Sequence, residues 1–125
     1  MKFVLVEKHL YWWPVTVRVP DPDQPGKFAE QELQVQFEAR RQEEAVALQE
    51  AYAKLSTPRE RAEAEIAELR AICQGWDGVV DGNGNPVPFS EETFARALDQ
   101  SWFRAGVWTA YHQSVFGIEA GSVGN

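Results

Sequence analysis

The sequence predicts an α+β fold, in which a small N-terminal antiparallel β-sheet precedes a mostly helical C-terminal part with a short second hairpin. Three observations predict it. Two runs in which apolar and polar residues alternate, 13–19 and 29–38, flank a loop rich in proline. Helix-forming residues dominate 41–70, and two further helical segments follow a glycine-rich turn. Alternation with a period of two is typical of half-buried strands, whereas Ala, Glu, Gln and Leu favour helices.

The length and composition predict one globular domain. The chain has 125 residues, of which 44% are hydrophobic, and a single cysteine, which excludes an internal disulfide framework. We therefore expect one domain over 1–125, divisible into sub-halves 1–74 and 75–125 at a segment rich in turn residues. No apolar run approaches the roughly 20 residues that span a bilayer, and no signal peptide is recognisable, so we expect a soluble cytoplasmic protein without membrane contact.

The charge pattern argues against direct binding to nucleic acid. The formal net charge is −7, and no basic run is longer than Arg40-Arg41. Proteins that bind the phosphate backbone need clustered Lys and Arg to release its counterions. We therefore expect no nucleic-acid partner.

The first strands should form a hairpin. Residues 3–6 are apolar and β-prone and predict a short strand or edge piece, and residues 13–19 predict a strand that starts near Pro14. The breaker cluster at 20–26 then separates the second alternating run. The apolar positions expected on one face are Val15, Val17, Val19, Leu33, Val35 and Phe37.

Two helices should cover this face. The first is expected at about 41–55, and the second begins where Thr57 caps it with Pro58 at the first position and Glu60 at the third, as in a capping box. We expect Gly75 to end the second helix. The apolar stripe of the second helix is predicted to contain Ala62, Ile66, Leu69 and Cys73.

The C-terminal part predicts two more helices. Ser90 should cap a third helix whose apolar side carries Phe94 and Leu98. A break near 99–101 then leads into a last helix at about 101–116. The stripe expected on this last helix contains Trp108, Tyr111, Val115 and Ile118.

Residues 81–92 match most of an EF-hand calcium loop but are better interpreted as a hairpin. Asp81, Asn83, Asn85 and Glu92 stand at ligand positions. The sixth position, however, requires glycine and holds Pro86, whose φ is fixed near −65°. An Asn-Gly turn between Val79-Val80 and Val87 explains the same residues as a β-hairpin.

Residue types that would indicate catalysis are sparse. His9 and His112 lack partners at ligand spacing, Cys73 falls on an apolar stripe, and no nucleophile elbow, phosphate loop or dinucleotide motif is present. We therefore expect a non-enzyme that needs no metal and no cofactor. The adjacent Trp12 and Trp13 should face opposite sides of a strand, so that one of them is exposed as a candidate contact residue.

Two stretches resemble tail assembly chaperones of long-tailed, siphophage-type bacteriophages and prophages. One is Trp-Pro-Val-Thr-Val-Arg-Val-Pro at 13–20, followed by a breaker loop and a Leu-Gln-Val-Gln-Phe strand. The other is Gly-Trp-Asp-Gly-Val-Val-Asp-Gly-Asn-Gly-Asn-Pro-Val-Pro-Phe-Ser-Glu-Glu at 75–92, followed by an aromatic-rich last helix. Members of that family often end in basic residues, whereas the tail after Glu119 contains no Lys or Arg.

The resemblance implies a non-catalytic protein that binds the tape measure protein and helps to recruit tail tube (major tail) subunits. It would act in the host cytoplasm, be absent from the mature virion, and form a homo-oligomer. An acidic, aromatic-bearing partner can cover the apolar stripes of a helical tape protein while staying in solution. We predict partner contacts at Tyr11 and Trp12 near the sheet edge and at Trp102 and Phe103 near the start of the last helix.

Two alternatives remain open at this stage. A structural head–tail or tail component would stay in the virion, where protein analysis of purified particles would find it. A calcium-binding or enzymatic protein would show a saturable response to calcium. In addition, residues 123–125 could be encoded GTG GGA AAC, which contains a slippery heptamer, so ribosomal frameshifting to a longer product is a prediction that the gene sequence would test.

Overall fold

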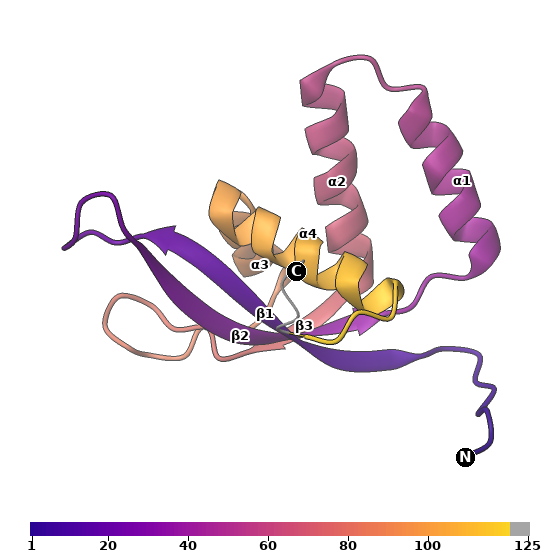
Figure 1. Cartoon of the computed structure of the whole chain (residues 1–125), viewed down its shortest axis with the longest axis horizontal. Coiled ribbons are helices and arrows are strands. Elements are labelled where there is room, and N and C mark those ends of the chain that lie inside the picture. Colours follow the sequence, from indigo (N-terminus) through magenta and orange to yellow (C-terminus); the bar gives the residue numbers. More distant parts are fainter. Residues whose placement is uncertain (121–125) are drawn as a thin grey trace.

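The computed structural model describes residues 1–120 and contains a three-stranded antiparallel sheet with helices on one face (Figure 1). The sheet order is β1-β2-β3, so the first and third strands are its edges. The elements in chain order are β1 (Leu10–Pro20), β2 (Phe28–Glu38), α1 (Gln42–Ala53), α2 (Pro58–Ile72), β3 (Cys73–Asp77), α3 (Glu91–Leu98) and α4 (Ser101–Val115). This arrangement confirms the predicted α+β class.

The β1–β2 hairpin follows the alternating pattern of the sequence. Val15 pairs with Leu33, and Trp13 pairs with Val35, so the apolar positions share the face beneath the helices. The turn is closed by the Asp21 N–H, which donates to the Lys27 carbonyl at 2.9 Å. Gly26 adopts a φ of 82°, a conformation that side-chain-bearing residues rarely accept. The predicted first hairpin is confirmed, and it is longer than the alternating runs alone indicated.

The third strand was not expected from the sequence. We predicted that the second helix continues to Gly75, but α2 ends at Ile72 and Cys73 is already extended, with φ −87° and ψ 121°. Strand β3 pairs antiparallel with β2, and the register shifts between Gln36 and Phe37. Both Cys73 and Trp76 are buried in this strand. The four-residue spacing that looked like a helical stripe is therefore broken at Cys73, which enters the core from a strand.

The predicted caps of the helices are confirmed. The Thr57 hydroxyl accepts the Glu60 N–H at 3.1 Å, and the Glu60 carboxylate accepts the Thr57 N–H in return. The Ser90 hydroxyl accepts the Thr93 N–H at 3.0 Å at the start of α3. Such reciprocal bonds satisfy N–H groups that have no partner inside the helix.

Helices α1 and α2 project together from the sheet (Figure 1). Helix α2 buries Leu69 and Ile72 at its base, whereas α1 buries no residue. The two helices are linked near their tip, where the Tyr52 hydroxyl donates to the Arg61 carbonyl at 3.3 Å. The base is tied by Arg40, which pairs with Glu68 of α2 and lies 3.5 Å from Glu44 of α1. The hairpin of helices is thus anchored to the body mainly through α2.

Residues 79–87 form the predicted second hairpin. The Val87 N–H donates to the Val79 carbonyl at 2.9 Å, and Val80 forms an isolated bridge with Pro86. One carboxylate oxygen of Asp81 accepts the N–H groups of both Asn83 and Asn85. The turn therefore uses this carboxylate to fix its own backbone, as Asx turns do.

Helix α4 covers β1 and completes the core. Its buried residues include Phe103 and Val107, and they join the inner face of the sheet and α3 in one hydrophobic cluster. A Cβ atom on Gly106 would lie 2.8 Å from the Thr16 carbonyl oxygen, so the helix backbone sits directly against the edge strand. Helices that cover an edge protect its unpaired backbone groups from other chains.

Two expectations concern the ends of the chain. Residues 3–6 form no strand, contrary to our prediction, and each of them is exposed. No strand among residues 1–120 pairs with them, and a single strand cannot satisfy its own hydrogen bonds. The frameshift prediction concerns residues 123–125, which lie outside the described residues.

The buried thiol of Cys73 provides a test of this packing. The residue is 4% exposed, and burial raises the pKa of its thiol well above the ordinary value, with Glu68 adding to the effect. Because the thiolate is the nucleophile, we expect a disulfide reagent to label the native protein far more slowly than the urea-unfolded chain. Equal labelling rates before and after unfolding would contradict the burial of β3.

Candidate interaction surface

The outer face of the sheet, opposite the helices, exposes the even-numbered residues of β1 and β2. Trp12 is 50% exposed there, whereas Trp13 on the inner face packs against the core. This confirms that the two adjacent tryptophans face opposite sides. The outer-face residues around Trp12 are polar, which leaves one large aromatic ring in polar surroundings.

We name the surroundings of this ring the Trp12 patch: Trp12, Gln34, Gln36, Gly75 and Asp77. Trp12 pairs with Gln36 across the β1–β2 ladder, and its ring passes 3.7 Å from the position that a Cβ of Gly75 would occupy. The indole therefore lies within van der Waals reach of Gly75, across the neighbouring strand. A hollow of about 440 Å³ opens beside the ring, lined by Trp12, Gln34, Trp76 and Asp77.

A second hollow, of about 670 Å³, lies between α4 and the turn-proximal half of the hairpin. We name it the α4 groove. Helix α4 supplies its more apolar wall, whereas the strands supply a mixed wall with two carboxylates. Its lining residues are Pro14, Thr16, Arg18, Glu30, Glu32, Trp102, Ala105, Gly106, Thr109, Ala110, Gln113 and Ala120.

The lining of the α4 groove has an excess of negative charge, since its charged residues are Glu30, Glu32 and Arg18. Within residues 1–120, neither Glu30 nor Glu32 forms an ion pair. Arg18, the basic residue of the lining, lies 4.7 Å from the centre of the Phe28 ring, a cation–π arrangement on the same hairpin. The groove therefore presents the exposed carboxylates of Glu30 and Glu32 beside Trp102 and Ala105, with Arg18 directly across the ladder from Glu30.

The structure separates the four predicted contact residues. Trp12 belongs to the Trp12 patch, and Trp102, which is 39% exposed, lines the α4 groove. Tyr11 is half-buried on the inner face, where its hydroxyl bonds Ser114 at 2.8 Å and burial raises its pKa. Tyr11 therefore offers only part of its ring to a partner.

The expectation that Phe103 is exposed was wrong. Phe103 is 8% exposed and packs edge-on against Trp76 and Phe94, with ring centroids 6.2 Å away in each case. On a helix, adjacent residues point about 100° apart, and in α4 this places Phe103 in the core and Trp102 at the surface. Phe103 therefore belongs to the hydrophobic core, whereas Trp102 lines the α4 groove.

Sequence reasoning missed the groove and its carboxylates. Glu30 and Glu32 occupy the outward positions of the alternating run at 29–38, which identifies them as exposed but gives no reason to single them out. The contact of the β1 edge with Gly106 is what brings them near α4. Gly106 in the middle of an otherwise helical segment was the available signal, because glycine there often marks close packing.

Two further findings bear on the chemistry. Within residues 1–120, no cluster of three or more His, Cys, Asp or Glu side chains is placed to hold a metal ion. Among the same residues, no helix combines the length and apolar character that crossing a bilayer requires.

Comparison with known proteins identifies a family. The model of the family described as YdaY prophage protein matches residues 24–114, a range that runs from the β1–β2 turn almost to the end of α4. No curated protein and no solved structure shows a significant match. The matched range covers well over half of the chain and includes both carboxylates of the α4 groove, and it leaves the first 23 residues outside. The chain therefore belongs to the YdaY prophage protein family.

Proposed function

We propose that this prophage protein is a non-catalytic tail assembly chaperone, which binds the tape measure protein and helps to recruit tail tube subunits in the host cytoplasm. Membership of a prophage protein family supports a phage-derived role. The resemblance of residues 13–20 and 75–92 to tail assembly chaperones supports the narrower assignment. Both stretches contribute to the outer face of the sheet, where the Trp12 patch lies.

The Trp12 patch is the observation that carries this proposal. A half-exposed tryptophan loses its contact with water when an apolar side chain covers it, and such residues dominate the energetics of many interfaces. The adjacent Asp77 carboxylate and the Gln34 amide suit Lys or Arg side chains at the edge of the same contact. The patch therefore fits an amphipathic helix whose apolar stripe is flanked by basic residues.

Replacing Trp12 by alanine should weaken this binding. We expect a loss of about 2 kcal/mol, or roughly 30-fold in affinity, because the ring supplies most of the apolar area of the patch. The measurement is co-purification with the co-expressed tape measure protein of the same prophage, followed by titration of the purified pair. Phe28→Ala is the matched control, because Phe28 is also about half exposed, on the same hairpin but outside the patch.

Three results would contradict the proposal in whole or in part. If the native protein does not retain the tape measure protein, the chaperone assignment fails. If it does, and Trp12→Ala binds as tightly as Phe28→Ala, the assignment survives but the patch is not the contact surface. A purified virion that contains this chain would exclude transient action and favour a structural component.

A further inference from the structure

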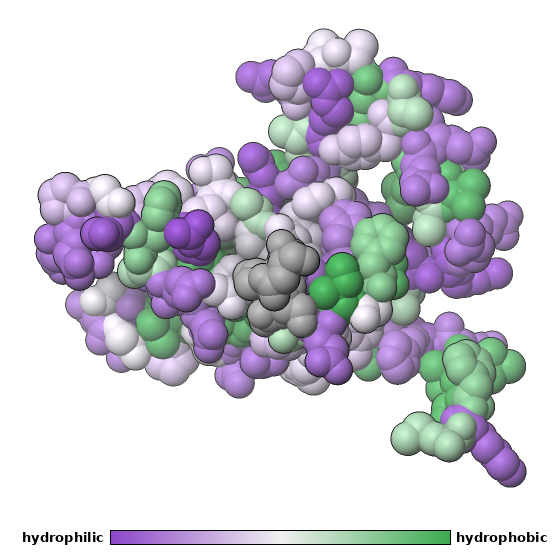
Figure 2. All heavy atoms as spheres, in the orientation of Figure 1, coloured by the Kyte–Doolittle hydropathy of each residue, from purple (hydrophilic) through white to green (hydrophobic). Residues whose placement is uncertain are grey.

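The N-terminal arm, which we define as residues 2–6, is an exposed apolar segment that no other part of the described chain covers. Phe3 and Leu5 are each 87% exposed, and Val4 and Val6 are exposed as well. Figure 2 shows this hydrophobic arm set apart from the body of the protein. Adjacent exposed apolar residues of this kind mark interaction sites in native proteins.

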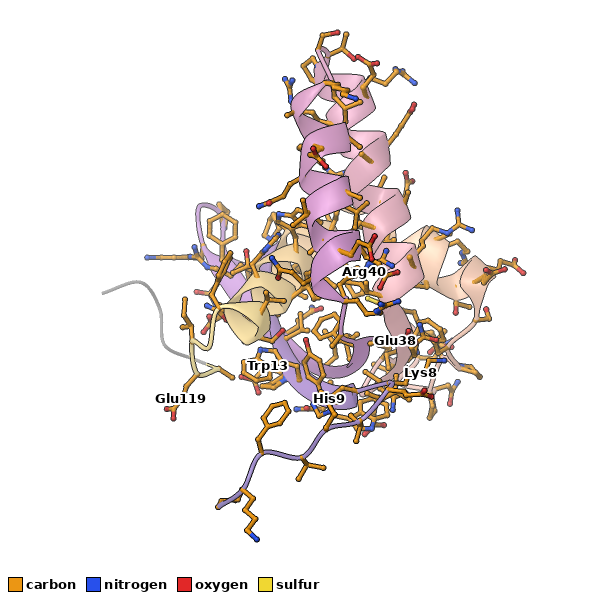
Figure 3. All side chains as sticks on the ribbon, turned by 90° about the vertical axis from the view of Figure 1, so that its right-hand side faces the viewer. Lys8, His9, Trp13, Glu38, Arg40 and Glu119 are labelled. Atoms are coloured by element: carbon orange, nitrogen blue, oxygen red, sulfur yellow. The ribbon has the colours of Figure 1, made fainter. Side chains whose placement is uncertain are left out.

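The arm is directed away from the groove of its own molecule. The His9 carbonyl accepts the Ala39 N–H at 3.0 Å, and Lys8 lies 3.5 Å from the Glu38 carboxylate. These two contacts extend the β1–β2 pairing beyond Leu10, and Figure 3 shows the arm continuing outward past Lys8 and His9. The groove begins at Pro14, on the other side of Leu10 along the same strand. The two contacts therefore lie between the arm and the groove along the chain.

The arm and the α4 groove match in length. From Trp102 to Gln113 the groove follows α4 for roughly 16 Å, at about 1.5 Å per residue. The five arm residues in an extended conformation also cover roughly 16 Å, at about 3.3 Å per residue. The sequence Phe-Val-Leu-Val favours this extended form, because β-branched and aromatic residues prefer it.

The two surfaces also match in chemistry. The arm joins one cation, Lys2, to four apolar side chains. The groove joins the exposed carboxylates of Glu30 and Glu32, which form no ion pair within residues 1–120, to the exposed indole of Trp102. A basic residue at the end of an apolar segment is the occupant that such a groove suits, since the ion pair fixes its direction and the apolar contact supplies affinity.

We propose that the N-terminal arm of one copy of this chain binds in the α4 groove of a second copy. Lys2 then lies at the Glu30–Glu32 wall, and Phe3 and Leu5 contact Trp102 and the small residues of α4. If the exchange is reciprocal the product is a closed dimer, and if it is head-to-tail the product is an open chain of copies. The proposal does not depend on the chaperone function, because it uses the groove and the arm rather than the Trp12 patch.

The test measures the mass of the full chain by sedimentation velocity over a concentration series. We expect the native protein to form a dimer or a larger assembly. The arm variant Phe3→Asp/Leu5→Asp and the groove variant Glu30→Lys/Glu32→Lys should each weaken self-association by about tenfold or more. All four positions are exposed, so both variants should keep the native circular dichroism and unfolding midpoint. Val46→Asp, on the exposed surface of α1, is the matched control and should leave the assembly unchanged.

A mixing experiment distinguishes this contact from other routes to association. The arm variant keeps an intact groove, and the groove variant keeps an intact arm, so an equal mixture should associate more tightly than either variant does alone. The charge exchange Lys2→Glu with Glu32→Lys should restore association that Glu32→Lys reduces. A native chain that remains monomeric at its solubility limit would overturn the proposal. Unchanged association in either the arm or the groove variant would overturn it as well, because the copies would then meet through another surface.

Discussion

Replacing Phe37 by alanine is expected to destabilise the protein by about 3–5 kcal/mol, which is the usual cost of deleting a fully buried phenylalanine. Phe37 is completely buried near the end of β2. The centroid of its ring lies 5.4 Å from that of Tyr111 in α4 and 5.8 Å from that of Tyr11 in β1. Because one ring joins the sheet to the last helix, its removal leaves a cavity that neither element can close alone. The measurement is the midpoint of urea unfolding.

Phe28→Ala is the control for this experiment. Phe28 begins the same strand but is 54% exposed. Apart from the loss of its contact with Arg18, truncation of its side chain to alanine should change the unfolding free energy by no more than about 0.5 kcal/mol. Similar losses for the two variants would contradict the assignment of the inner and outer faces of β2. Such a domain has a total stability of about 5–15 kcal/mol, so the Phe37 variant should be close to unfolding at ordinary temperatures.

The second large effect is expected at Gly106. Valine at this position would place its Cβ 2.8 Å from the Thr16 carbonyl oxygen and 3.2 Å from Val17 Cγ2. The oxygen belongs to the backbone of β1 and cannot move aside as a flexible side chain could. The helix would have to separate from the sheet, and overpacking of this kind typically costs about 1–3 kcal/mol. This cost exceeds the gain of about 0.5 kcal/mol that valine has over glycine in helix propensity.

The same substitution should also alter the α4 groove, because Gly106 lies in its lining. Urea unfolding gives the loss of stability, and far-ultraviolet circular dichroism shows whether α4 stays helical. Gly82→Ala is the control, since a Cβ there meets no atom within 4 Å and the glycine has no positive φ. If Gly106→Val were as stable as the native protein, the close approach of α4 to β1 would be incorrect.

Local patterns in the sequence predicted most of the fold correctly. Alternation around Val15 and Leu33 identified the first hairpin, and side chains with capping chemistry, Thr57 and Ser90, located two helix starts within a residue. These features depend on neighbours within a few positions of the chain. Burial of Trp76 and Cys73 in a third strand depends instead on pairing with Val35 and Phe37 of β2, which lie far earlier in the sequence. Helical spacing upstream of Cys73 therefore concealed the strand.

The Trp12 patch and the α4 groove were harder to predict from the sequence than the fold. Exposure of Trp12 follows from alternation along one strand, once the inner face is known. The α4 groove, by contrast, combines three segments that are distant in the sequence, so that neither Glu30 nor Trp102 indicates the other. Phe103 shows the same limit, because an aromatic residue near a helix start is equally compatible with core and surface until the helix has been placed.

The projecting helix α1 should make this part of the chain tolerant of insertions and deletions. Since α1 buries no side chain, the segment between Ala39 and Pro58 can gain or lose residues without leaving a hole in the interior. A reporter domain inserted at Ser56 would stand at the far tip of the helical pair, remote from the strands. The protein thus offers an attachment point for a fluorescent label at the tip of the helical pair, in a segment that lines neither the Trp12 patch nor the α4 groove.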